Sequence, residues 1–124
     1  MTCIFCSLSD NKIVFSNNSV NIIEDQYPVN PGHMLIILKR HIPDWWGITK
    51  QEQVDIIEAI NKAKMIIESK HSPAGYNIGI NNGVAAGQTI MHLHIHLIPR
   101  YIGDMDKPEG GVRHVIPSRG KYSR

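Results

Sequence analysis

The sequence predicts an α+β fold with a mainly antiparallel sheet. Three features predict it: short β-prone runs in the first part of the chain, one amphipathic helical segment in the middle, and two strands of alternating apolar residues after it. Strands, then a helix, then more strands are typical of this class. The 124 residues are expected to form one domain, 1–124, because a chain of this length buries about two thirds of its unfolded surface in one core.

The first part of the chain contains three predicted strands. Residues 12–15 and 19–24 are short β-prone runs, and Ser16-Asn17-Asn18 between them predicts a hairpin. Residues 25–32, with two prolines, interrupt the pattern. Residues 34–38 form a continuous aliphatic run, which is typical of a central strand buried on both faces.

A helix is predicted from about Thr49 to about Ser69. Thr49 and Glu52 have the spacing of a capping box, in which each side chain bonds to the backbone of the other residue. Trp45 and Trp46 precede the cap, and we expect both to pack against the sheet. Apolar residues that recur at helical spacing should face the sheet, namely Ile56, Ile60, Ala63 and Ile67.

Two more strands are predicted after the helix. Apolar and polar or small residues alternate in 76–81, and histidines alternate with aliphatics in 92–97. The short Gly/Ala-rich segment 82–87 joins them, so we expect a hairpin. Because side chains alternate between the two faces of a strand, the aliphatics should enter the core and the histidines should form a row on the other face. This imidazole row is His92, His94 and His96.

The imidazole row is the main candidate site. Neighbouring histidine Cα atoms of the row should lie about 6.6 Å apart, so one metal ion does not easily bind all three. The three rings can instead act separately, as metal ligand, nucleophile and acid. Asn81, Gln88 and Thr89 add amide and hydroxyl groups, and the small residues of 83–87 allow backbone N–H groups to approach a phosphate.

Cys3 and Cys6 are the two cysteines of the sequence. Their spacing leaves a redox pair or half of a metal site as alternatives, since so short a loop is a poor structural disulfide. No strand precedes them, unlike in thioredoxin-like redox motifs, and this favours a metal site if two nitrogen ligands lie nearby.

Composition excludes several classes of protein. The net charge of +2 is too small to argue for nucleic acid. No apolar run approaches the 18 residues of a membrane span, and the amino terminus lacks the pattern of a secretion signal. We therefore expect a cytoplasmic protein without a membrane or nucleic-acid partner.

Several motifs resemble the histidine-triad (HIT) superfamily. Residues 87–100 resemble its signature, in which Gly-Gln precedes three histidines that alternate with apolar residues. Residues 3–6, 27–33, 39–41 and 81–83 resemble further motifs, so the resemblance covers most of the chain. It implies a HIT-like fold with a five-stranded, mainly antiparallel sheet, one long helix and a short second helical segment.

The resemblance also implies roles for individual residues. It places the nucleophile at His94, with His96 near the phosphate and the leaving group. It places the acceptor of the ribose hydroxyls at Asp25. The phosphate contacts are implied at Asn81, Gln88 and Thr89.

A structural zinc site and a homodimer are implied in the same way. The zinc ligands would be two thiolates and two imidazoles, which complete a closed tetrahedral site, and no organic cofactor is expected. The homodimer would pair through the helix and a sheet edge. The implied ligands are Cys3, Cys6, His41 and His92.

The resulting expectation is a nucleotide hydrolase, or a nucleotidyl transferase, that acts at the α-phosphate through a covalent nucleotidyl-histidine. Substrates would be dinucleoside polyphosphates, or nucleoside phosphoramidates and acyl-adenylates. The uridylyltransferase branch of the superfamily has glutamine at the position of His96, which favours hydrolysis here. Two alternatives stay open: a metal-dependent enzyme that uses His92 and His94, and a purine nucleotide-binding module without turnover.

Residues 101–124 read as a basic tail that contains glycine and proline. One interpretation is a solvated tail. The other is a segment that orders over the substrate, because residues 110–117 resemble a carboxy-terminal segment of bacterial members of the superfamily. In that case Arg113 should face the distal phosphates.

Overall fold

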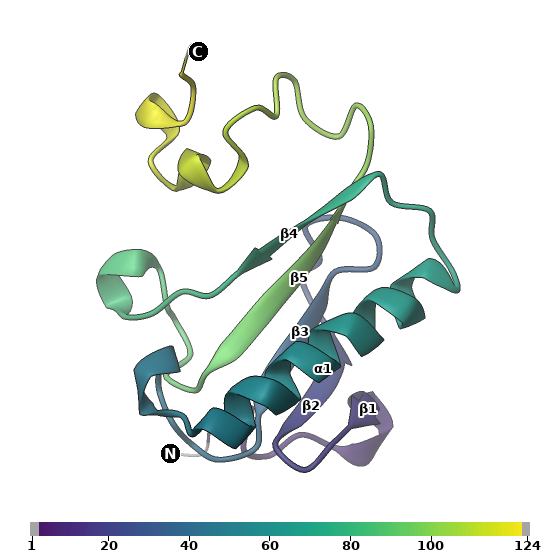
Figure 1. Cartoon of the computed structure of the whole chain (residues 1–124). Coiled ribbons are helices and arrows are strands. Elements are labelled where there is room, and N and C mark those ends of the chain that lie inside the picture. Colours follow the sequence, from purple (N-terminus) through teal and green to yellow (C-terminus); the bar gives the residue numbers. More distant parts are fainter. Residues whose placement is uncertain (1–2, 123–124) are drawn as a thin grey trace.

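The computed structural model describes residues 3–122, and its centre is a single five-stranded sheet in the order β1-β2-β3-β5-β4 (Figure 1). Each pair of neighbouring strands is antiparallel. The expected α+β fold with a five-stranded antiparallel sheet is therefore confirmed. The strands are β1 (Ile13–Ser16), β2 (Val20–Glu24), β3 (Met34–Leu38), β4 (Gly75–Gly79) and β5 (His94–Arg100).

One long helix, α1 (Lys50–Glu68), lies across one face of the sheet (Figure 1). The other helical pieces are 3-10 turns, and these correspond to the short second helical segment that was expected. They are η1 (Asp10–Lys12), η2 (Trp45–Gly47), η3 (Val84–Ala86), η4 (Gly111–Val115) and η5 (Pro117–Arg119). No helix in the described part of the chain is both long and apolar enough to cross a bilayer.

The start of α1 has the predicted capping box. The Glu52 N–H donates to Thr49 Oγ1, and the Thr49 N–H donates to Glu52 Oε1. The same carboxylate accepts two hydrogen bonds from the Arg40 guanidinium, which lies just after β3. Arg40 and the cap together lower the pKa of Glu52 to about 2. This ion pair fixes the helix start to the end of the central strand.

The two faces of β3 are both buried, as predicted, but they meet different partners. Met34, Ile36 and Leu38 join the main core beneath α1. Leu35 and Ile37 point to the opposite face, where they form a smaller cluster with Ile23 of β2 and Phe5. The predicted stripe of α1 packs on the first face, with Ile56, Ala63 and Ile67 buried and Ile60 half-buried against them.

The two tryptophans before α1 differ in environment. Trp45 packs against the main core, as expected, whereas the side chain of Trp46 is 77% exposed. The prediction for Trp46 was wrong, because the 3-10 turn η2 directs two consecutive side chains to different sides and only one reaches the core.

The tail folds on itself, and η4 contacts β4 (Figure 1). Hydrogen bonds of the Arg113 side chain hold the folded tail together. The Arg113 guanidinium donates to the carbonyl oxygens of Gly120 and Arg119 and lies over the ring of Tyr122, 4.7 Å from its centroid. A Cβ atom on Gly120 would collide with the ring of His114, so a larger residue there would displace this ring. Arg113 therefore stabilises the tail in this structure, in place of the expected orientation toward a substrate.

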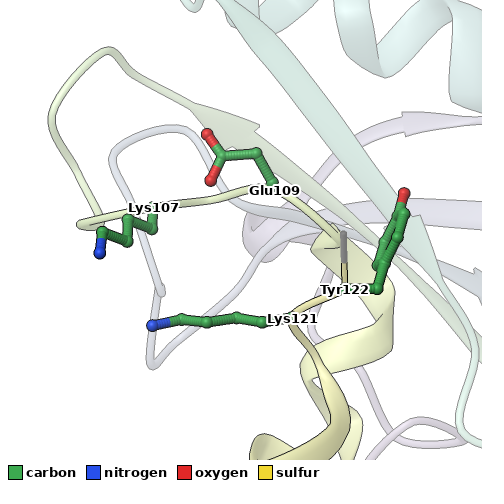
Figure 2. Close-up of a pocket in the computed structure, with 4 residues that line it drawn as sticks. All are labelled: Lys107, Glu109, Lys121 and Tyr122. Atoms are coloured by element: carbon green, nitrogen blue, oxygen red, sulfur yellow. The ribbon is translucent and has the colours of Figure 1, made fainter. Parts of the chain in front are cut away.

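A hollow in the same tail is lined by Lys107, Glu109, Lys121 and Tyr122 (Figure 2). Figure 2 shows the side chains of Lys107 and Lys121 extending to the same side of the view, whereas the Glu109 carboxylate points away from Lys121. All four residues belong to the tail, so this hollow is built separately from the imidazole row.

Candidate functional site

The imidazole row lies where it was predicted. Leu93, Ile95 and Leu97 enter the main core, whereas His92, His94 and His96 occupy the other face of the strand. The side chains of His92 and His94 are buried, and His96 is half-buried. Each of the three rings has a different hydrogen-bond partner, and these partners fix the position of the proton on each ring.

His92 has its proton on Nε2. This nitrogen bonds to the Leu38 carbonyl oxygen, and a carbonyl can only accept. Burial lowers the pKa of His92, so the ring is neutral and its Nδ1 carries a lone pair. That lone pair points toward the thiols of Cys3 and Cys6, at 3.4 Å and 3.5 Å.

The four predicted zinc ligands come together at this point. Cys6 Sγ lies 3.2 Å from His41 Nδ1, which is 3.1 Å from His92 Nδ1. All four ligand atoms, with Cys3 Sγ, lie within 4.8 Å of one another. In a tetrahedral zinc site with bonds of about 2.0 Å to nitrogen and 2.3 Å to sulfur, ligand atoms lie about 3.3–3.8 Å apart. The donor set and its spacing fit such an ion.

His94 has the opposite arrangement of its ring nitrogens. Its Nδ1 lies 2.8 Å from the carbonyl oxygen of His92, so Nδ1 carries the proton and donates. The lone pair of the neutral ring is therefore on Nε2. The backbone of the row itself thus orients a nucleophilic nitrogen, since a backbone acceptor of this kind fixes both the tautomer and the ring plane.

A histidine without an assigned role in the sequence, His33, lies beside His96. Its Nδ1 accepts from the Val29 N–H at 3.0 Å, so its proton is on Nε2. This Nε2 lies 2.9 Å from His96 Nδ1 and 3.3 Å from Asp25 Oδ2. The His33 N–H therefore donates to His96, and a neutral His96 carries its own proton on Nε2.

Burial is the main reason that these two rings stay neutral. It lowers the pKa of His33, although the Asp25 carboxylate opposes the shift. Burial lowers the pKa of His96 to about 4, with smaller contributions in the same direction from His94 and His33. At neutral pH, His96 is thus a neutral hydrogen-bond donor through Nε2.

Asp25, His33 and His96 are also close enough to share a metal ion. The position of the His33 proton does not favour a metal ion here. The Val29 N–H donates to the lone pair of Nδ1, so the ring proton is on Nε2 and this nitrogen has no lone pair for a metal. The hydrogen bonds to Val29 and His96 use both ring nitrogens of His33 without an ion. Both carboxylate oxygens of Asp25 make contacts of their own: Oδ1 accepts a hydrogen bond from the Tyr27 N–H, and Oδ2 faces the rings of His33 and His96.

The expected phosphate contacts divide into two groups. Asn81 and Thr89 are exposed at the two ends of the loop that carries η3. Gln88 is buried beneath the loop, where its Nε2 donates to the carbonyl oxygens of Pro43 and Ile90 and its Oε1 accepts from the Gly83 N–H. Gln88 therefore supports the loop, and a contact between its amide and a phosphate would break these bonds.

Comparison with known proteins identifies the family. Residues 7–103 match the HIT domain model. The chain belongs to the HIT family. As a family, HIT proteins have nucleotide-processing activities, and the curated relatives below include two such enzymes.

Two curated relatives of this HIT protein act on nucleotides by name. The asymmetrical bis(5'-nucleosyl)-tetraphosphatase of Schizosaccharomyces pombe is 40% identical over 80 residues, which span 64% of this chain and 44% of that protein. The AP-4-A phosphorylase of Mycobacterium tuberculosis is 33% identical over 100 residues, which span 78% of this chain and 51% of that protein. The chain thus matches about half the length of each relative.

A solved structure resembles the fold and contains zinc. The zinc-bound histidine triad family protein of Mycobacterium smegmatis is 31% identical, with a TM-score of 0.74 over 84% of this chain and 78% of that one.

Proposed function

We propose that this HIT protein hydrolyses nucleotides at the α-phosphate through a covalent nucleotidyl intermediate on Nε2 of His94. The observation that carries the proposal is the 2.8 Å bond from His94 Nδ1 to the His92 carbonyl, which leaves the lone pair on Nε2. When Nε2 attacks phosphorus, a P–N bond forms and the bond to the leaving group breaks. The leaving atom is an oxygen in polyphosphates and acyl-adenylates and a nitrogen in phosphoramidates, and it takes the electron pair of the broken bond. The ring becomes positively charged, and the same carbonyl stabilises that charge.

His96 and His33 support this step as a pair. His96 donates a hydrogen bond from Nε2 to the phosphate or the leaving oxygen, while His33 holds its Nδ1. In the second step water attacks phosphorus, the P–N bond breaks and Nε2 regains its lone pair. A nucleoside monophosphate leaves, and the proton of the attacking water passes to solvent. His96 acts here as a neutral donor, which agrees with its lowered pKa.

The substrate would be held by groups around the row. The exposed side chains of Asn81 and Thr89 would contact phosphate oxygens. The backbone N–H groups of Val84 and Ala85 would add to them, whereas those of Ala86, Gly87 and Gln88 bond within the loop. The Asp25 side chain is only 13% exposed, and it would accept the ribose hydroxyls through the lone pairs that its present contacts leave. These roles make dinucleoside polyphosphates, nucleoside phosphoramidates and acyl-adenylates the candidate substrates.

We also propose that the Cys/His group binds one zinc ion with a structural role. Four ligands of two types support it: two thiols, and two imidazoles from the histidine after β3 and the first histidine of the row. Their spacings fit a tetrahedral ion. Bound zinc would join the amino-terminal turn to the sheet. Pairing of two copies through α1 and the sheet edge at β4 stays a prediction. Ile57 and Met65 of α1 and Ile78 of β4 are exposed.

The metal-dependent alternative receives less support. It requires His94 as a ligand, and His94 belongs to neither of the two metal-capable groups found among residues 3–122. The binding module without turnover differs from a hydrolase only in chemistry, so an assay has to separate them.

A product analysis in heavy-oxygen water tests the proposal. The protein is incubated with diadenosine tetraphosphate and with adenosine phosphoramidate, with and without inorganic phosphate. Hydrolysis predicts AMP that carries one oxygen from water, whereas attack by phosphate predicts ADP. His94→Ala should be inactive and His71→Ala, a histidine outside the row, should retain activity. Binding of AMP without turnover of any substrate would favour the binding module and overturn the proposal.

A further inference from the structure

Phe5 lies between the two cysteines and faces the candidate nucleophile. Its ring is T-shaped against that of His94, with centroids 5.0 Å apart, and also against that of His92, at 5.9 Å. Phe5 is 8% exposed, whereas its neighbour Ile4 is 61% exposed. One side chain of the amino-terminal turn therefore reaches the ring on which the proposed reaction depends.

The turn that carries Phe5 has few other connections to the sheet. In the part of the chain that the structure describes, the backbone hydrogen bonds of residues 3–9 stay within residues 3–12. The Cys6 N–H donates to the Cys3 carbonyl, which closes the turn and brings both thiols to one side. The contacts that reach the sheet are the thiol–imidazole group and the apolar packing of Phe5 and its neighbours.

Two contacts from different sides restrain the His94 ring. The bond from Nδ1 to the His92 carbonyl fixes one edge of the ring, and Phe5 limits rotation of the ring about that bond. A nucleophile that attacks phosphorus needs its lone pair aligned with the bond that forms, so a lost restraint lowers the rate more than it lowers binding.

We propose that Phe5 is a positioning residue that couples occupancy of the Cys3, Cys6, His41 and His92 metal site to the orientation of the His94 ring. The proposal rests on the proposed function of His94, and it adds a regulatory consequence. With metal bound, the turn is fixed and Phe5 holds the ring. Without metal, the turn is held by apolar packing and by thiol–imidazole contacts, which are weaker than metal bonds. The restraint that Phe5 places on the His94 ring is then reduced, while the backbone bond of His94 and its contact with the His96 ring remain.

The test combines chelation with substitution at Phe5. Turnover of diadenosine tetraphosphate is measured with and without EDTA for the wild type, Phe5→Ala, Phe5→Leu and Ile4→Ala, the last being the matched control from the same turn. Chelation should lower the wild-type kcat about 10-fold, and Ile4→Ala should behave in the same way. Phe5→Ala with metal retained should show a similar loss in kcat with little change in KM. Chelation should then have little further effect, and Phe5→Leu should recover most of kcat.

Two results would overturn the coupling. Equal chelation effects in the wild type and in Phe5→Ala would show that the coupling does not pass through Phe5. A loss confined to KM would show that Phe5 contacts substrate and does not position His94.

Spectroscopy of the imidazole rings tests the same idea without turnover. Long-range ¹H–¹⁵N spectra of the wild type should show a shifted or broadened His94 signal after chelation, whereas the His71 signal stays unchanged. An unchanged His94 signal would overturn the proposal even if Phe5→Ala failed to fold. A shifted signal in a protein that hydrolyses none of the substrates would preserve the coupling and reject the proposed function instead.

Discussion

His33 donates from Nε2 to Nδ1 of His96 across 2.9 Å, although the two residues are 63 positions apart in the chain. The direction of this bond follows from the Val29 N–H, which uses the other nitrogen of His33. It fixes the proton of a neutral His96 on Nε2. A backbone N–H in the turn before β3 thus determines which nitrogen of His96 can donate to a substrate.

The first prediction concerns loss of the His33 donor by substitution. His33→Phe should lower kcat by about 10- to 100-fold, because His96 then exchanges between two tautomers and loses its orientation. AMP affinity should change little, and His33→Gln, which keeps an N–H donor, should recover part of the activity. Steady-state kinetics and ¹⁵N spectra of the imidazoles provide the measurement. Unchanged kcat in His33→Phe would show that His96 needs no support from His33.

The second prediction concerns pH. The pKa of His96 is about 4 in the folded protein, and its ordinary value, which applies to the unfolded chain, is 6.5. Between pH 4 and pH 6.5 the unfolded chain therefore binds a proton at His96 that the folded protein does not. The stability that neutral His96 provides should be complete above pH 6.5 and decrease as the pH falls toward 4. At pH 5 the loss should be about 2 kcal/mol.

Urea unfolding at pH 7 and pH 5 measures this loss, with His96→Gln as the comparison because its side chain does not titrate. The groups that face His96 are His33, His94 and Asp25, and they remain in the variant. An equal loss of stability in the wild type and the variant would contradict the assignment.

The third prediction concerns the ion pair at the helix start. Glu52→Gln should destabilise the protein by about 1–2 kcal/mol at pH 7, a value reduced because Arg40 is half exposed. The pKa of Glu52 is lowered to about 2 from 4.5, so its contribution is present above pH 4.5 and lost as the pH falls toward 2. Urea unfolding should show most of the difference gone at pH 3. If the difference in unfolding free energy between the wild type and Glu52→Gln stayed constant from pH 7 to pH 3, the destabilisation would come from packing and not from the ion pair.

The fourth prediction concerns the metal. Protein purified without chelators should contain about one zinc per chain, and Cys6→Ser should weaken zinc binding by more than about 100-fold. EDTA should lower the melting temperature of the wild type, since metal binding contributes to folding stability. Ser7→Ala, next to the turn, is the control. Metal-free protein with a melting temperature that EDTA does not change would reject the site.

Much of this structure could be predicted because its signals are local. Alternation in 92–97 places the histidines on one face whatever the rest of the chain does, and the Thr49–Glu52 spacing predicts a cap that depends on one helical turn. The central strand β3 was predictable because an aliphatic run of that length has no polar face.

The remaining features depend on contacts between distant parts of the chain. A single histidine after Pro31-Gly32 has no pattern that indicates a partner on β5, so the role of His33 was missed. The supporting role of Gln88 in the loop could not be predicted either, because its amide donates to the carbonyl of Pro43, 45 residues away. The contacts of Arg113 could not be predicted for the same reason. Its acceptors are backbone carbonyl groups that come close only when the tail folds, and the composition of the tail does not indicate this.

The most direct test of the account is to trap the intermediate on His94. Rapid acid quench of the wild type during turnover of diadenosine tetraphosphate, followed by mass spectrometry, should show a nucleotide-sized adduct on the peptide that contains residues 91–100. His94→Ala should show no adduct, lose at least about 10³-fold in kcat, and keep AMP binding and melting temperature close to those of the wild type. No adduct in the wild type, together with substantial activity in His94→Ala, would contradict the account.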